Sequence, residues 1–167
     1  MAMLVYLIRH GIAIDREEPD CPPDAERPLT KKGIARVRVV MKGILQLGAK
    51  PDLILSSPLV RAWQTAELAA KALHYPKDKI RRSEALLPEA EPTALMKELA
   101  RMKAEQVLCT GHAPHMDEFI SQATGNRRSF TALKKAGVAC IEFEEFAPGA
   151  GILTALYPPR VFRLLED

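Results

Sequence analysis

The chain has 167 residues, 47% of them apolar and 27% charged, which predicts one domain over residues 1–167 with room for a substantial core. Its 24 basic and 21 acidic residues leave a net charge of +3, too small to indicate nucleic-acid binding, and no apolar run approaches the roughly 20 residues of a membrane helix. No signal peptide is evident and the three cysteines are widely spaced, so we expect free thiols in the cytoplasm, with the oligomeric state left open.

The first element is a continuous apolar run over residues 3–8 (MLVYLI). Such a run predicts a strand buried on both faces, as in parallel sheets. It ends directly on Arg9, His10 and Gly11, without a polar transition. Burial of a guanidinium and an imidazole carries a large desolvation cost unless a partner offsets it. The end of this strand therefore requires an explanation.

A loop with several prolines and acids follows over residues 11–29. A loop of this length in a compact domain is usually functional or mobile. Thr30 is suited to cap the next helix, whose apolar residues recur at helical spacing, and Gly48 can supply its left-handed stop.

The run DLILSS over residues 52–57 predicts a second short buried strand. We expect Ser57 to cap the following helix, with Pro58 at its first position. This start places Arg61 in the first turn of the helix, and Pro92 begins the next helix.

The run QVLCTG over residues 106–111 predicts a third buried strand, which His112 follows. Pro114 starts another helix. The loop after this helix contains Arg127 and Arg128, which are either solvated or able to meet an acidic partner protein.

The stretches GVACIEFEEF (137–146) and GILTALY (151–157) flank a Pro-Gly turn, which predicts a hairpin whose first strand is half-exposed. Strands that alternate with helices and end in a hairpin predict a three-layer α/β/α sandwich with a mixed, mostly parallel sheet.

Each of the three buried strands is followed by basic or imidazole side chains: Arg9 and His10, then Arg61, then His112. Ligands of open α/β sheets bind outside the carboxyl ends of the strands, so parallel neighbours would bring these four groups to one crevice. Two guanidinium forks and an imidazole match the three oxygens of a phosphoryl group. Hydrogen bonds to charged groups, worth roughly 1.5–3 kcal/mol each, can offset the desolvation. Gly11 would leave room for close approach of the bound group.

Such a crevice can transfer a phosphoryl group without a metal or another cofactor. One neutral histidine can attack phosphorus and form a phosphohistidine, while the other stays protonated and donates to the equatorial oxygens. Phosphoryl transfer depends mainly on positioning and charge stabilisation, which these groups supply.

Three motifs, LIRHG, SSPLVRAWQTA and GHAP, resemble in content and order the signatures of the histidine phosphatase superfamily, which includes the phosphoglycerate mutases. The resemblance extends over essentially the whole chain. It implies a phosphoglycerate mutase-like fold in which His10 is the phosphorylated nucleophile. It also implies that Arg9, Arg61 and His112 bind the phosphoryl group.

Within that superfamily, the small size and the stretch ERPLTKKG (26–33) resemble the SixA-type phosphohistidine phosphatases, which lack the inserted cap of the mutases. The mutases carry an Asn in the loop after RHG, and residues 12–29 contain none. The resemblance therefore implies dephosphorylation of phosphohistidine on a partner protein. The alternative substrate is a small phosphate monoester.

The proton donor for the leaving group stays open. Glu89 is best placed by its order in the chain, and Glu84, Asp15 and solvent are the alternatives. A phosphoramidate asks less of a donor than an alkyl phosphate does, because the protonated imidazole leaves as a neutral ring.

Two other classes of function use the same residues. His10, His112, His115 and Asp117 could form a metallohydrolase site, but the spacing across a proline is poor for metal ligands and two arginines would repel a cation. A protein that only binds phosphorylated partners would not need both histidines and both arginines. The arginines could instead pair with buried carboxylates, although no acid lies near either of them in the sequence.

Overall fold

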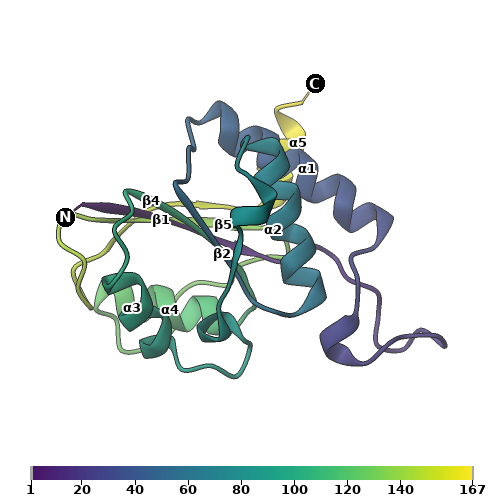
Figure 1. Ribbon diagram of the computed structural model, residues 1–167, viewed down its shortest axis with the longest axis horizontal. Coiled ribbons are helices and arrows are strands. Elements are labelled where there is room, and N and C mark those ends of the chain that lie inside the picture. Colours follow the sequence, from purple (N-terminus) through teal and green to yellow (C-terminus); the bar gives the residue numbers. More distant parts are fainter. Residues whose placement is uncertain (1, 167) are drawn as a thin grey trace.

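The sheet of the computed structural model, which describes residues 2–166, combines parallel and antiparallel strands (Figure 1). The strand order is β3-β2-β4-β1-β5-β6, in which β3, β2, β4 and β1 run parallel while β5 is antiparallel to β1 and to β6. The strands are β1 (Met3–Arg9), β2 (Leu53–Ser56), β3 (Arg81–Arg82), β4 (Gln106–Gly111), β5 (Val138–Phe143) and β6 (Ile152–Tyr157). The predicted mixed, mostly parallel sheet is confirmed.

Helices cover both faces of this sheet, as Figure 1 shows. One layer contains α1 (Lys31–Gln46), α2 (Val60–Ala72) and α5 (Pro159–Leu164), and the other contains α3 (Pro92–Ala100) and α4 (His115–Thr124). The short 3₁₀ turns are η1 (Asp24–Glu26), η2 (Lys77–Lys79) and η3 (Glu84–Leu86). The three-layer α/β/α sandwich is therefore also confirmed. Within residues 2–166, each helix is too short or too polar to span a membrane.

The central strand β1 is buried from both sides, as its continuous apolar run predicted. Val5 and Leu7 belong to the core cluster formed with α3 and α4. Tyr6 and Ile8 belong to the cluster formed with α1, α2 and α5. Since successive side chains of a strand point to opposite faces, one apolar run contributes to both cores.

The pairing of the parallel strands aligns their carboxyl ends. Arg9 at the end of β1 is level with Gly111 at the end of β4, and Ser56 at the end of β2 is level with Thr110. The residues that follow these strands therefore start from the same edge of the sheet. This register is what brings the three sequence motifs together.

Two local predictions were wrong. Ser57 does not cap α2: the helix begins at Val60 with Leu59 as its N-cap, and the Ser57 hydroxyl lies 2.8 Å from Nε2 of His112. The strand β5 is buried along most of its length instead of half-exposed. Its alternate side chains enter the two core clusters, Ala139, Ile141 and Phe143 on one face and Val138 and Cys140 on the other, so both faces are covered.

The stretch ERPLTKKG fixes the loop after β1 against the start of α1. Leu29 forms an isolated antiparallel bridge with Ala13, and the Thr30 side chain accepts a hydrogen bond from the Gly33 amide, which confirms the predicted cap. A Cβ at Gly33 would collide with the carbonyl oxygen of Ile12. The glycine of the motif therefore permits α1 to contact the backbone just beyond the end of β1.

Replacing Gly33 by Ala should lower the free energy of unfolding by about 1–3 kcal/mol, because the backbone at Ile12 must shift to admit the methyl group. Alanine has a higher helix propensity than glycine, so propensity alone would raise the free energy of unfolding instead of lowering it. Urea titration measures it, with Lys32→Ala, an exposed neighbour, as the control. Equal stability of Gly33→Ala and the wild type would contradict the close packing of these segments.

Candidate active site

A cavity of about 710 Å³ opens at the carboxyl edge of the sheet. Its lining includes all four groups expected there, Arg9, His10, Arg61 and His112. They reach the cavity from three parts of the fold: Arg9 and His10 from the end of β1, Arg61 from the first turn of α2, and His112 from the position after β4. The predicted convergence of the three motifs is therefore a property of the structure.

His10 lies buried on the floor of this cavity, with 7% of its surface exposed. Its Nδ1 lies 2.7 Å from the carbonyl oxygen of Gly11. Because a carbonyl can only accept, Nδ1 carries the ring proton and Nε2 keeps its lone pair. The local backbone thus selects the tautomer whose Nε2 can act as a nucleophile.

The surroundings of His10 favour its neutral form. Burial lowers the pKa of His10 to about 4, and the positive charges of Arg61, Arg9 and Lys135 act in the same direction. The hydrogen bond to the Gly11 carbonyl opposes them and is outweighed. At neutral pH the imidazole is therefore unprotonated.

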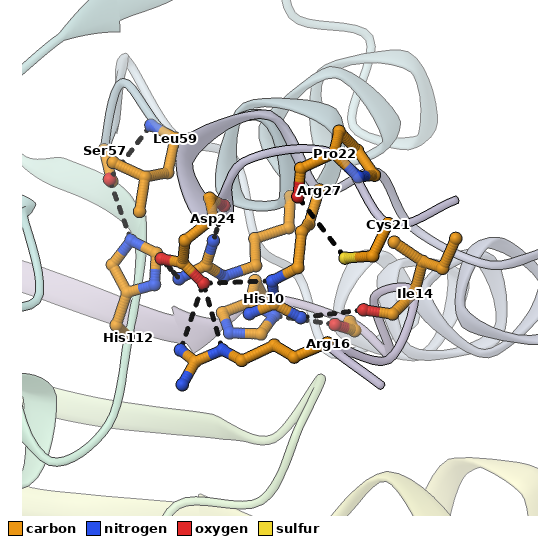
Figure 2. Close-up of polar contacts among 12 residues, drawn as sticks. His10, Ile14, Arg16, Cys21, Pro22, Asp24, Arg27, Ser57, Leu59 and His112 are labelled. Carbon is orange, nitrogen blue, oxygen red and sulfur yellow. Dashed lines mark hydrogen bonds and ion pairs between the residues drawn. The ribbon is translucent and has the colours of Figure 1, made fainter. Parts of the chain in front are cut away.

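His112 faces His10 across the cavity, with the two ring centroids 5.2 Å apart. Its Nε2 lies 2.8 Å from the Ser57 hydroxyl, and its Nδ1 is on the other side of the ring, toward Asp24 in the view of Figure 2. A serine after β2 thereby orients the histidine after β4. Sequence reasoning missed this role of Ser57, because the preceding strand and following proline resemble a helix start.

The expectation that the second histidine stays protonated disagrees with the surroundings of His112, which favour the neutral ring. Burial, together with the smaller effects of His10 and Arg61, lowers the pKa of His112 to about 3. The neutral ring can still donate one hydrogen bond. If the Ser57 hydroxyl donates to Nε2, the proton of His112 lies on Nδ1.

Both arginines are held by backbone carbonyls and keep unused donors. Arg9 Nη1 donates to the Leu133 carbonyl at 3.0 Å, and Arg61 Nη1 donates to the Asp24 carbonyl at 2.8 Å. Burial lowers the pKa of both guanidinium groups from the ordinary value, which is the desolvation expected from the sequence. Arg9 Nε, Arg61 Nε and His112 Nδ1 are buried and have no hydrogen-bond partner within residues 2–166.

Arg61 also has a carboxylate partner, which the sequence did not indicate. Asp24 of η1 lies 3.4 Å from Arg61 Nη2 and binds Arg16 and Arg27 as well (Figure 2). The pairing was invisible in the sequence because Asp24 precedes Arg61 by 37 positions. Only the path of the loop after β1 brings it to the cavity.

Gly11 has a different role from the predicted one. Its amide donates to Thr65 Oγ1 at 3.2 Å and its carbonyl is bound by His10, so its backbone is not free to meet a ligand. A Cβ at Gly11 would lie 2.6 Å from a methyl group of Val37. The glycine therefore allows contact with α1, and Gly11 is absent from the cavity lining.

The candidate proton donors differ in position. Glu89 and Asp15 line the cavity, and Glu84 does not. Glu89 lies exposed in the turn after η3, at the rim of the cavity. Arg127 and Arg128 lie on an exposed loop away from the cavity, so their contact with a partner stays a prediction.

Of the four residues of the metallohydrolase alternative, only His10 and His112 lie together in the cavity lining. Asp117 accepts hydrogen bonds from the Thr131 hydroxyl and the Leu133 amide, and His115 is buried outside the cavity lining. In the described part of the chain, no group of three or more His, Cys, Asp or Glu side chains could hold a metal ion.

Comparisons with known proteins agree with this fold and these motifs. The sequence model of the histidine phosphatase superfamily (branch 1) matches residues 5–86. An uncharacterized protein of Picosynechococcus sp. (strain PCC 7002) is 38% identical over 140 residues, which cover 81% of this chain and 82% of that protein. The phosphohistidine phosphatase SixA of Escherichia coli (strain K12) is 28% identical over 127 residues, covering 72% of this chain and 73% of SixA.

Two further matches cover different shares of this chain. A solved structure of the protein histidine phosphatase SixA complexed with tungstate superimposes with a TM-score of 0.85 at 22% identity, covering 95% of this chain and 99% of that chain. The mitochondrial serine/threonine-protein phosphatase Pgam5 of Drosophila ananassae is 32% identical over 76 residues, which cover 46% of this chain and 25% of Pgam5.

The fold, the edge cavity and these matches define the class: the chain belongs to the histidine phosphatase superfamily. Within that superfamily the similarity to SixA supports the SixA-type branch and a phosphohydrolase activity.

The lowered histidine pKa values should make the fold less stable in acid. An unfolded histidine binds its proton near the ordinary pKa of 6.5, whereas folded His10 does so at about 4. Between these values the unfolded chain binds more protons, so the free energy of unfolding should fall as the pH falls from 6.5 toward 4.

Urea titrations at several pH values between these limits measure the slope. His10→Gln removes one contribution and should give a shallower pH dependence than the wild type. Arg101→Gln, an exposed change just before β4 at the opposite sheet edge, should keep the wild-type slope. An unchanged slope in His10→Gln would contradict the neutral, buried state of His10.

Proposed function

We propose that this protein is a metal-independent phosphatase that forms a phosphohistidine intermediate on His10. The observation that carries the proposal is the single cavity that Arg9, Arg61 and His112 line together with neutral His10. Arg9 Nε, Arg61 Nε and His112 Nδ1 have no hydrogen-bond partner among the described residues. Unpaired buried donors are costly, and a tetrahedral dianion would satisfy them together.

In the first step of the proposed mechanism, Nε2 of His10 attacks phosphorus in line, and the bond from phosphorus to the leaving group breaks. Arg9 and Arg61 stabilise the charge on the non-bridging oxygens, and His112 contributes one N–H from Nδ1. Ser57 fixes the orientation of His112. Water then attacks the phosphohistidine, releases inorganic phosphate and restores neutral His10.

The substrate we propose is a phosphohistidine side chain of a partner protein. The cavity is open to solvent, and its walls come from the 11–29 loop and the segment around Glu89. A phosphorylated imidazole can take its proton from solvent and leave as a neutral ring. It therefore does not depend on an exposed rim carboxyl such as Glu89, and the similarity to SixA supports the same substrate class.

A small phosphate monoester is the alternative substrate. It is favoured by the position of Glu89 at the rim, where a carboxyl can protonate an alkoxide leaving group. The three cysteines are free thiols, which supports action in the reducing cytoplasm. We propose that residues 1–167 act as one domain.

Incubation with a phosphorylated substrate followed by rapid quenching should trap an acid-labile phosphate on His10, detected by mass spectrometry of the peptide.

Arg61→Ala should lower kcat by roughly 10²–10³, as loss of a charge-stabilising donor does. The matched change Arg101→Ala, at the opposite sheet edge, should keep wild-type kcat, and excess EDTA should have no effect. Wild-type turnover in Arg61→Ala would refute the proposed phosphoryl site.

A phosphohistidine protein and a panel of alkyl phosphates, assayed side by side, should show higher kcat/KM for the phosphohistidine protein. Glu89→Gln should reduce alkyl phosphate hydrolysis by about 10²-fold or more, the range for a lost general acid, and reduce phosphohistidine hydrolysis much less. Equal, large losses on both substrates would show that phosphohistidine also requires this acid. Preference for an alkyl phosphate would favour the alternative substrate.

A further inference from the structure

The loop after β1 places one carboxylate, Asp24, beside Arg16 and Arg27 of the same loop and Arg61 of α2. Asp24 Oδ1 accepts from Arg16 Nε at 3.1 Å and from Arg27 Nε at 3.0 Å, and Arg16 Nη2 lies 3.0 Å from the same oxygen. The carboxylate also contacts Arg61, one of the two arginines of the proposed phosphoryl site. Figure 2 shows this carboxylate between Arg16 and Arg27.

The two oxygens of Asp24 are used unequally. Oδ1 carries the short contacts to Arg16 and Arg27, whereas Oδ2 meets Arg61 Nη2 at 3.4 Å, near the limit of a hydrogen bond. The stronger link to Arg61 is the uncharged backbone carbonyl of Asp24, which accepts from Nη1 at 2.8 Å. The loop therefore holds Arg61 mainly through a neutral group.

This asymmetry matters because a carboxylate beside the phosphoryl site is an internal competitor. The carboxylate can form an ion pair with Arg61 and so neutralise its positive charge. It would also repel a phosphoryl dianion at close range. Partial burial opposes ionisation of Asp24, but the hydrogen bond from Arg27 and the charges of Arg61 and Arg16 outweigh it and hold the pKa of the carboxyl below its ordinary value. Asp24 is therefore ionised. If Arg61 is to bind a phosphoryl group, cations other than Arg61 must neutralise this carboxylate.

Arg27 is built for that task. Its side chain is largely buried, and Nη1 donates to the Ile14 carbonyl at 2.8 Å while Nε holds Asp24. Arg16 is 70% exposed and contributes a more mobile second contact. The arginine of the ERPLT stretch thus joins both ends of the loop, a role that the motif alone did not explain.

We propose that Arg27 is a positioning residue for phosphoryl binding. With Arg16 it holds the Asp24 carboxylate in ion pairs. Arg61 then stays attached to the loop by a neutral carbonyl, and its positive charge remains available to the substrate. The inference rests on the proposed function in one respect, the binding of the phosphoryl group by Arg61. It adds a residue of the cavity lining that acts through Asp24 and Arg61.

Isothermal calorimetry with inorganic phosphate at fixed ionic strength tests the proposal without turnover. Arg27→Gln should weaken phosphate binding about tenfold, a change of about 1.4 kcal/mol, because the freed carboxylate engages Arg61. Asp24→Asn should bind phosphate about threefold more tightly than the wild type, since it removes the competing charge. Arg101→Gln, with the same loss of charge at the opposite sheet edge, controls for net charge.

The double variant Arg27→Gln/Asp24→Asn gives the decisive readout. It should recover phosphate binding to within about threefold of the wild type, because no carboxylate remains to compete. A merely structural role of Arg27 predicts no rescue, since Asn at position 24 cannot replace the contact with the Ile14 carbonyl. Thermal melts of all variants confirm that they are folded at the assay temperature.

Two outcomes would overturn the inference: a double variant as weak as Arg27→Gln, or weaker binding in Asp24→Asn than in the wild type. Arg61→Ala in the same series separates this failure from that of the proposed function. If Arg61→Ala binds phosphate as well as the wild type, the phosphoryl site itself is refuted. If it loses binding while Arg27→Gln does not, only the role of Arg27 is wrong.

Discussion

The enclosure of four basic or imidazole groups at one sheet edge, three of them buried and Arg9 half-buried, is the constraint on which the rest of this structure depends. Arg61 and His112 are 3% and 2% exposed, and His10 is nearly as enclosed. Desolvation drives both histidines to their neutral forms, while the arginines stay charged because no physiological pH deprotonates them. The site therefore combines a neutral imidazole with fixed positive charge, which suits attack on an anionic phosphoryl group.

The loop after β1 supplies the remaining electrostatic balance. Its prolines and the ERPLT stretch lead the chain past the cavity and back to α1, where Thr30 and Gly33 fix its return. On the way, η1 presents a backbone carbonyl to Arg61 and a carboxylate to Arg16 and Arg27. Packing against α1 and charge compensation at the cavity wall are thus two functions of one segment.

The departures from the sequence predictions share a physical cause. Ser57 and Gly11 have the local signatures of a helix cap and of a ligand-binding glycine, but each is used by a partner distant in the chain: Ser57 by His112, and Gly11 by Thr65 and Val37. Local patterns describe what a residue can do with its neighbours. They do not describe competition from a side chain that arrives from another strand.

The sequence by itself determined the buried strands, their alternation with helices and the identity of the four groups at the strand ends, because apolar runs and abrupt polar ends are properties of contiguous residues. Tertiary structure alone decided that β2, β4 and β1 are parallel neighbours in register. It also decided the charge state of His112 and the pairing of Asp24 with Arg61. Burial and electrostatic contact depend on distances through space, which the order of residues along a chain does not encode directly.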